Sequence, residues 1–260
     1  MRTRGKNRLR EKLQSGQVVL GSVIYSWSPN VMEVAGYADL DFMRIDNEHA
    51  WRQDRSAEEL MRAAELVGVE AVMRVDRDNP YLIRKALEIG AAGIIVPDIH
   101  NVEEAEAVVR AAKFPPRGTR GYSASCRSGR WGSEAAAGWI EWSDSEPMVG
   151  VMIEHVSVMD HVADVLAVEG LDFVLFGPSD YSMSLGLGKP SKEDEQVQEA
   201  LKRTIAAARK SGKHVMLGVG TSLEEIRRYR DMGVTMLEVG NDLGILRSFW
   251  KERADAVRGG

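Results

Sequence analysis

The chain has 260 residues, of which 44% are hydrophobic, so it can bury one large core or two small ones. Its formal net charge of −5 gives no support for nucleic-acid binding, and no apolar run approaches the length that a membrane span needs. Cys126 is the only cysteine, which excludes an internal disulfide and indicates a reducing cytoplasm.

The first predicted element is a basic run at residues 2–12, which lacks the apolar stretch of a signal peptide and is expected to form a solvated helix. From there, short β-branched runs alternate with longer amphipathic runs. We predict strands at Val18–Tyr25, Leu40–Ile45, Glu70–Val75, Gly93–Val96, Met148–Glu154, Leu171–Phe176, His214–Gly218 and Met236–Val239. Apolar residues at i, i+3 and i+4 predict helices at Asn30–Gly36, Ala57–Val67, Pro80–Ile89, Val102–Lys113, Val158–Val168, Glu193–Lys210, Ser222–Asp231 and Leu243–Val257.

The strand pattern predicts an α/β fold with a parallel sheet. The runs at 93–96 and 173–176 are continuously apolar, which is typical of strands buried on both faces. Eight strand–helix units in 260 residues predict a (β/α)8 TIM barrel, with residues 1–260 as a single domain. The alternative, a doubly wound open sheet, requires a glycine-rich phosphate loop after the first strand, and residues 26–30 contain no glycine.

Residues 114–147 do not fit the repeat, because this segment is too long for a simple connection. It is rich in Gly, Ser, Arg and Trp, and we expect either a functional loop or an oligomer contact. One hypothesis is that it reaches the site of a neighbouring subunit, which full activity of a monomer would contradict.

Polar residues gather at the predicted carboxyl ends of the strands, where barrel enzymes place their chemistry. In chain order these ends carry Ser26, Asp46, Glu48, His49, Arg74, Asp98, Glu154, Ser179, Asp180, residues 218–220, Asn241 and Asp242. Glu154 and Asp180 offer the hard oxygen ligands that Mg²⁺ or Mn²⁺ prefers. The alternatives are a buried ion pair for Glu154 and a helix N-cap for Asp180.

His49 follows Asp46 by three residues, so the carboxylate could accept the imidazole N–H and make His49 a general base. Arg74 could stabilise an enolate oxygen. An ion pair with Glu48 or Glu88 is an equally good interpretation of Arg74. No lysine lies at a predicted carboxyl end, which argues against a Schiff-base aldolase and favours a metal as the group that stabilises the carbanion.

Several runs in the chain match a known family. They are residues 45–49, 73–75, 87–91, 95–97, 114–121, 130–131, 153–154 and 176–182. With these runs the chain resembles the HpcH/HpaI aldolase family, the metal-dependent class II pyruvate aldolases related to citrate lyase β-subunits, over roughly residues 18 to 250.

The resemblance implies a role for each matching residue. Glu154 and Asp180 would bind the divalent metal (Mg²⁺ or Mn²⁺, with Co²⁺ as a further candidate), which pyruvate would chelate. Backbone amides near Ser179 and Asp180 would hold the pyruvate carboxylate. His49, oriented by Asp46, would act as the base, Arg74 would stabilise the enolate, and Glu88 would support the His49 network. The resemblance also implies a homohexamer, a dimer of trimers, with exchanged C-terminal helices. The apolar residues Ile245, Leu246, Phe249 and Trp250 could make that contact, and the alternative is that they pack on the chain's own barrel.

We therefore expect a lyase that cleaves a 4-hydroxy-2-oxo acid, such as 4-hydroxy-2-oxoheptanedioate or a 2-keto-3-deoxy sugar acid, to pyruvate and an aldehyde. One alternative is a CoA-thioester lyase of the citrate lyase β type. Another is a phosphosugar isomerase or epimerase, because residues 218–221 and 239–241 lie where barrels commonly bind phosphate. A third is a non-catalytic barrel that serves as a binding or regulatory subunit.

Overall fold

The strands form a closed parallel barrel. The computed structural model describes residues 5–49, 56–77, 79–133 and 135–259. The strands are β1 (Val19–Ile24), β2 (Phe42–Asp46), β3 (Glu70–Arg74), β4 (Gly93–Val96), β5 (Met148–Ile153), β6 (Phe173–Phe176), β7 (His214–Val219) and β8 (Met236–Asn241). They pair in chain order, and β8 pairs with β1. This topology confirms the predicted (β/α)8 TIM barrel and excludes the open doubly wound sheet.

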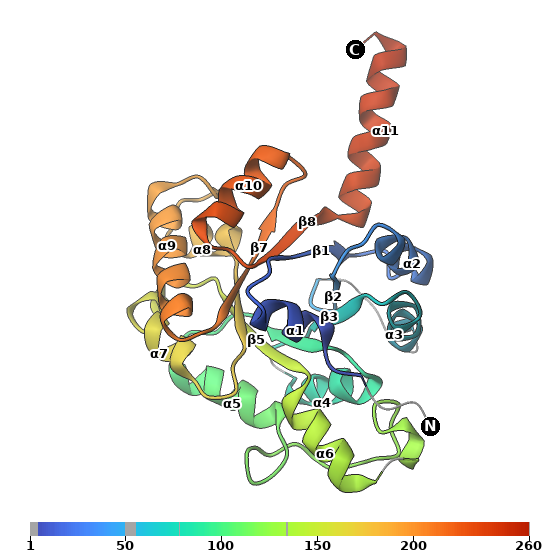
Figure 1. Cartoon of the computed structure of the whole chain (residues 1–260). Helices are drawn as coiled ribbons and strands as arrows, with labels where there is room; N and C mark the ends of the chain where they lie inside the picture. The colour runs from blue at the N-terminus through green and yellow to red at the C-terminus, as the bar shows by residue number, and fades with distance from the viewer. Residues whose placement is uncertain (1–4, 50–55, 78, 134, 260) are drawn as a thin grey trace.

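Helices surround the strands (Figure 1). They are α1 (Arg8–Gln14), α2 (Pro29–Tyr37), α3 (Ser56–Val67), α4 (Pro80–Ile89), α5 (Val102–Ala112), α6 (Ala136–Ser145), α7 (Val162–Ala167), α8 (Pro178–Ser184), α9 (Glu195–Lys210), α10 (Leu223–Met232) and α11 (Asp242–Arg258). Sequence analysis missed α6 and α8, and the helix predicted at Val158–Val168 is divided into a short 3-10 turn and α7. None of the helices within the described ranges is both long and apolar enough to span a bilayer.

The interior of the barrel is packed with alternate side chains of the strands. One buried cluster contains Phe42, Val72, Ile95, Met148, Met152, Phe173, Leu175, Met216 and Met236. Leu9 and Leu13 of α1 belong to the same cluster. The helix α1 therefore closes the amino-terminal end of the barrel, because its apolar side is buried against the strands.

The N-terminal basic run forms the predicted helix, with Lys6, Arg8 and Lys12 exposed, but one side of the helix is buried. Leu9 and Leu13 are buried, and Arg10 forms an ion pair of 2.7 Å with Asp172 on the barrel. A run of charges says nothing about the apolar residues between them, and those residues decide how the helix packs. Residues 2 and 4 of the run lie outside the described residues.

The described part of the 114–147 segment packs on its own barrel at the amino-terminal end of the strands. The buried guanidinium of Arg120 lies 4.6 Å from the ring centroid of Phe114 and 5.8 Å from that of Trp139. Trp142 Nε1 donates a hydrogen bond to the carbonyl of Gly5, just before α1. Within one chain the segment is thus anchored far from the strand ends that carry the predicted site. Its function in an assembly stays a prediction.

The last helix, α11, extends away from the barrel (Figure 1). It carries a row of exposed apolar side chains, namely Leu243, Ile245, Leu246, Phe249, Trp250 and Val257. Ordinary packing on the chain's own barrel, the alternative to a contact between exchanged helices, does not account for these residues, because they are exposed within one chain. Their exposure along this 17-residue helix leaves an apolar surface open to a partner.

Candidate active site

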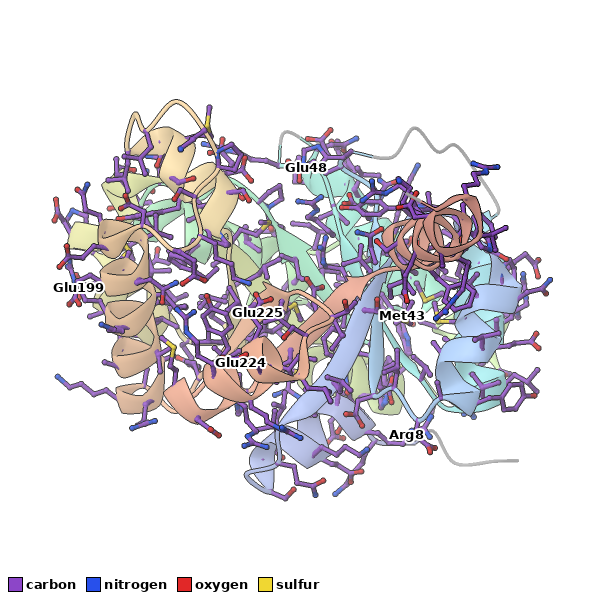
Figure 2. The ribbon with its side chains drawn as sticks, turned by 90° about the horizontal axis from the view of Figure 1, so that it is seen from above. Arg8, Met43, Glu48, Glu199, Glu224 and Glu225 are labelled. Atoms are coloured by element: carbon purple, nitrogen blue, oxygen red, sulfur yellow. The ribbon has the colours of Figure 1, made fainter. Side chains whose placement is uncertain are left out.

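The carboxyl ends of β2, β3, β5 and β6 bring most of the predicted residues to one end of the barrel. Figure 2 shows Glu48 at this end of the molecule and Arg8 at the opposite end. Asp46 closes β2 and is the register partner of Arg74, the last residue of β3. Glu154 follows β5 directly, and Asp180 lies in the first turn of α8, after β6.

Arg74 is buried and pairs with two carboxylates. Its NH2 donates to Oδ2 of the fully buried Asp46, and its NH1 lies 2.7 Å from Oε2 of Glu48. Burial alone would raise the pKa of Asp46, but the charge and hydrogen bond of Arg74 hold that pKa below its usual value. The alternative of an ion pair with Glu48 is therefore present in the structure, and it places a cation at the carboxyl end of β3.

His49 contacts Asp46 differently from the prediction. Oδ1 of Asp46 accepts the backbone N–H groups of Glu48 (3.0 Å) and His49 (3.1 Å), and the described contacts of the two residues include no bond between the imidazole and Asp46. The imidazole Nε2 instead lies 3.8 Å from Oε2 of Glu48, with 64% of the side chain exposed. Asp46 thus fixes the backbone that carries His49, and its described contacts do not fix the ring.

Glu154 is a buried carboxylate at the carboxyl end of β5. Its Oε1 accepts the backbone N–H of Asp98 at 2.6 Å. Burial, followed by the charges of Asp180 and Glu48, raises its pKa to about 7. The salt bridges of the described residues include none to Glu154, so the alternative of a buried ion-pair partner has no support within that part of the chain. The capping alternative for Asp180 was wrong, because the N-cap of α8 is Gly177.

The local charge balance fits a divalent cation. Three acidic side chains, Glu48, Glu154 and Asp180, lie close together: the charge of Asp180 raises the pKa of both Glu48 and Glu154, and the buried Arg74 opposes this effect. Carboxylate oxygens are the ligand type that Mg²⁺ and Mn²⁺ prefer. Among the described residues, no group of three or more His, Cys, Asp or Glu side chains could hold a metal, so Glu154 and Asp180 would need ligands from water or substrate.

Glu88 is not part of this cluster within one chain. It lies in the last turn of α4, where its carboxylate is 3.9 Å from Nε of Arg84 and its carbonyl accepts the N–H of Ser128. The helix runs from the carboxyl ends of the strands toward their amino ends, so a residue late in α4 lies at the far end of the barrel. The alternative ion pair between Glu88 and Arg74 is therefore wrong.

Sequence analysis missed a second ion pair beneath the site. Arg44 of β2 and Glu238 of β8 are both buried, with Nε of Arg44 2.5 Å from Oε1 of Glu238. NH1 of Arg44 also lies 3.6 Å from Oδ2 of Asp46. In the sequence this ion pair was indicated only by one charged residue within each of two apolar strands. Arg44 stands two residues before Asp46, which places both side chains on the barrel interior.

The ends of β7 and β8 are less suited to phosphate than predicted. The backbone N–H of Gly220 donates to Oε2 of Glu225 at 3.1 Å, so a carboxylate already lies where a phosphate would bind. Lys192, which the sequence did not place near a strand end, lies 2.5 Å from Glu225 and donates to the carbonyl of Gly218. Its amine is thus held in an ion pair, which disfavours a Schiff-base role.

Comparison with known proteins identifies the family. The model of the HpcH/HpaI aldolase/citrate lyase family matches residues 22–248, and the chain belongs to this family. It is 33% identical to a 5-keto-4-deoxy-D-glucarate aldolase of Klebsiella pneumoniae, with 97% of each chain covered. It is 32% identical to a hydroxypyruvate/pyruvate aldolase of Pseudomonas aeruginosa, which covers 98% of this chain and 94% of the relative.

The fold also matches solved structures. The crystal structure of the citrate synthase SbnG superposes with a TM-score of 0.86 at 29% identity, covering 97% of this chain and 98% of SbnG. The family likeness therefore extends over nearly the whole barrel and includes relatives named for aldol cleavage and for citrate synthesis.

Proposed function

We propose that the protein is a metal-dependent class II aldolase that cleaves a 4-hydroxy-2-oxo acid to pyruvate and an aldehyde. The observation that carries the proposal is the pair of carboxylates, Glu154 and Asp180, at neighbouring strand ends in the same electrostatic cluster as the buried Arg74. The names of the relatives support this class, and a 2-keto-3-deoxy sugar acid is the kind of substrate that they suggest.

In this proposal Glu154 and Asp180 hold Mg²⁺, Mn²⁺ or Co²⁺. The bound cation would neutralise negative charge that develops on the 2-oxo acid. The first backbone N–H groups of α8, at Ser179 and Asp180, orient the carboxylate of the substrate. Arg74, held in place by Asp46, adds a second positive charge at the position where the enolate oxygen forms.

His49 moves the proton in the same proposal. It takes the proton of the C4 hydroxyl, the C3–C4 bond breaks, and the electron pair passes to C3 and the C2 oxygen as the enolate of pyruvate. The aldehyde leaves, and C3 then regains a proton. Exposure of the imidazole lets it exchange that proton with solvent between turnovers. Glu88 is part of this proposal only in an assembly, where Glu88 of a neighbouring chain would lie at the site.

Metal dependence is testable without knowing the aldehyde. Pyruvate C3 protons should exchange with D₂O, followed by NMR, when Mn²⁺ or Mg²⁺ is added to chelator-stripped protein, and should not exchange without metal. The Glu154→Gln variant with added metal serves as the control and should not support exchange, because it lacks one of the two carboxylates. Absence of exchange in the wild-type protein under both conditions would contradict the proposal.

The assembly that we propose is a homohexamer, a dimer of trimers, in which α11 packs on a neighbouring chain. Its exposed apolar row supports this arrangement. Trp250→Glu should therefore reduce the mass measured by light scattering after gel filtration, because a charge would be buried against the partner. Tyr81→Glu is the matched control, since Tyr81 is 67% exposed and Trp250 is 64% exposed. An unchanged mass for Trp250→Glu would exclude this contact.

We also propose that the protein is cytoplasmic, as the single cysteine predicted.

A CoA-thioester reaction is the second candidate, favoured by the likeness to a structure named as a citrate synthase. Release of free CoA from acetyl-CoA in the presence of oxaloacetate would support this candidate. If CoA is released in this assay and pyruvate C3 protons do not exchange in the NMR experiment, the thioester reaction would replace the aldolase proposal.

A further inference from the structure

Asp98 has an unusual backbone conformation beside the proposed metal ligand Glu154. It follows β4 by two residues and has a φ of +54°, in the left-handed region that residues with a side chain seldom adopt. In this conformation its N–H points at Glu154 and donates to Oε1 at 2.6 Å. Residues held in such conformations persist where the surrounding structure fixes them, and they are concentrated at functional sites.

An ion pair with Arg77 and a hydrogen bond with His100 fix Asp98 from two sides. NH1 of Arg77, in the connection between β3 and α4, lies 2.5 Å from Oδ2 of Asp98. Nε2 of His100 lies 2.7 Å from Oδ1. Glu104, in the first turn of α5, ties these two partners together, because it pairs with Arg77 at 2.9 Å and accepts the backbone N–H of His100. Both carboxylate oxygens of Asp98 are thus held while its backbone faces Glu154.

The Glu154 carboxylate also lies against Gly177. A Cβ added at Gly177 would lie 3.0 Å from both the Cβ and Oε2 of Glu154, a tighter contact than most side chains make, so the glycine leaves room for the carboxylate. The carboxylate is therefore confined by the N–H of Asp98 and the bare backbone of Gly177. Confinement of this kind fixes one rotamer of a buried ligand before any cation arrives.

We infer that Asp98 is a positioning residue for Glu154. Its left-handed backbone aims the N–H that holds Oε1, which leaves Oε2 as the oxygen for the cation. The inference rests on the proposed function, because it takes Glu154 to be a metal ligand. The part of Asp98 that acts is its backbone, and its side chain serves to hold that backbone in place.

The test is the Mn²⁺ dissociation constant, measured by EPR of free Mn²⁺ without substrate. Asp98→Val should weaken Mn²⁺ binding by about 10- to 100-fold, the usual effect of losing a partner that orients a ligand. A β-branched side chain disfavours positive φ, so the N–H turns away from Glu154. Asp98→Asn should stay within about threefold of the wild type, because asparagine accepts the left-handed conformation. Equal weakening in both variants would assign the effect to the charge and overturn the inference.

Two further variants separate the possible failures. Asp39→Val is the matched control, since Asp39 also has a positive φ, of 58°, but lies in the turn before β2 at the other end of the barrel. It should lower thermal stability without changing Mn²⁺ affinity. Glu154→Gln should abolish binding. Loss of binding in Glu154→Gln with normal binding in Asp98→Val would refute the positioning role alone. Normal binding in Glu154→Gln would refute the proposed metal site itself.

Arg77→Met provides a second route if Asp98→Val does not fold. It removes one of the two partners of the Asp98 carboxylate from a partly exposed position. Mn²⁺ binding should weaken in the same direction, by a smaller factor than in Asp98→Val. If the Arg77→Met variant is folded and binds Mn²⁺ as tightly as the wild type, the ion pair with Arg77 does not support the backbone of Asp98.

Discussion

Replacement of His49 by alanine is expected to lower the turnover of aldol cleavage by a factor of about 10² to 10⁴, the range that a general base supplies. The imidazole is accessible to solvent, because 64% of the side chain is exposed, and its Nε2 lies 3.8 Å from Oε2 of Glu48. The expected loss is in kcat, since His49 contributes no proposed ligand to the metal. The measurement is steady-state kinetics of pyruvate release, together with Mn²⁺ affinity, which should not change.

His161→Ala is the matched control for this prediction. His161 has 58% of its side chain exposed and lies before α7, beside Asp164, with no proposed part in the reaction. It should retain wild-type kinetics. A rate in His49→Ala that equals that of His161→Ala would remove His49 from the mechanism and would leave Glu48 as the next group to test as the base.

Replacement of Arg74 by methionine should have two large effects. Glu48 loses its nearest arginine and Asp46 keeps only Arg44, 3.6 Å away, so breaking this buried pair is expected to cost up to about 3–5 kcal/mol of unfolding free energy. Turnover should also fall by about 10²- to 10³-fold, because a charge aimed at the developing oxyanion is lost. Urea denaturation measures the first effect, and steady-state kinetics at a temperature where the variant is folded measures the second.

Arg44→Met separates these two effects. Arg44 is also buried and also pairs with two carboxylates, those of Glu238 and Asp46, but it lies one layer deeper in the barrel. The same loss of stability is expected, with a much smaller loss of turnover. Equal losses of turnover in the two variants would show that Arg74 acts by holding the barrel together and would contradict its role in the chemistry.

The barrel was predictable because its signals are local. Continuous apolar runs of four to six residues mark strands that are buried on both faces, and the amphipathic runs between them mark the covering helices. The order of residues then places Asp46, Arg74, Glu154 and Asp180 at carboxyl ends, which a parallel barrel brings together whatever its exact register. The helix α6 was missed because it lies in a segment with weak apolar periodicity, and α8 because it is only seven residues long.

The sequence by itself determined the fold, the family pattern and the set of residues that meet at the carboxyl end of the barrel. Only the tertiary structure decided which of these residues contact one another. Closure of the barrel pairs Arg44 with Glu238 across β1. A backbone turn makes Asp98 a donor to Glu154, and Asp46 holds the backbone of His49 instead of its ring. These contacts depend on the direction of each side chain and on the approach of residues that are far apart in the chain. A local pattern of amino acids encodes neither the direction nor the approach.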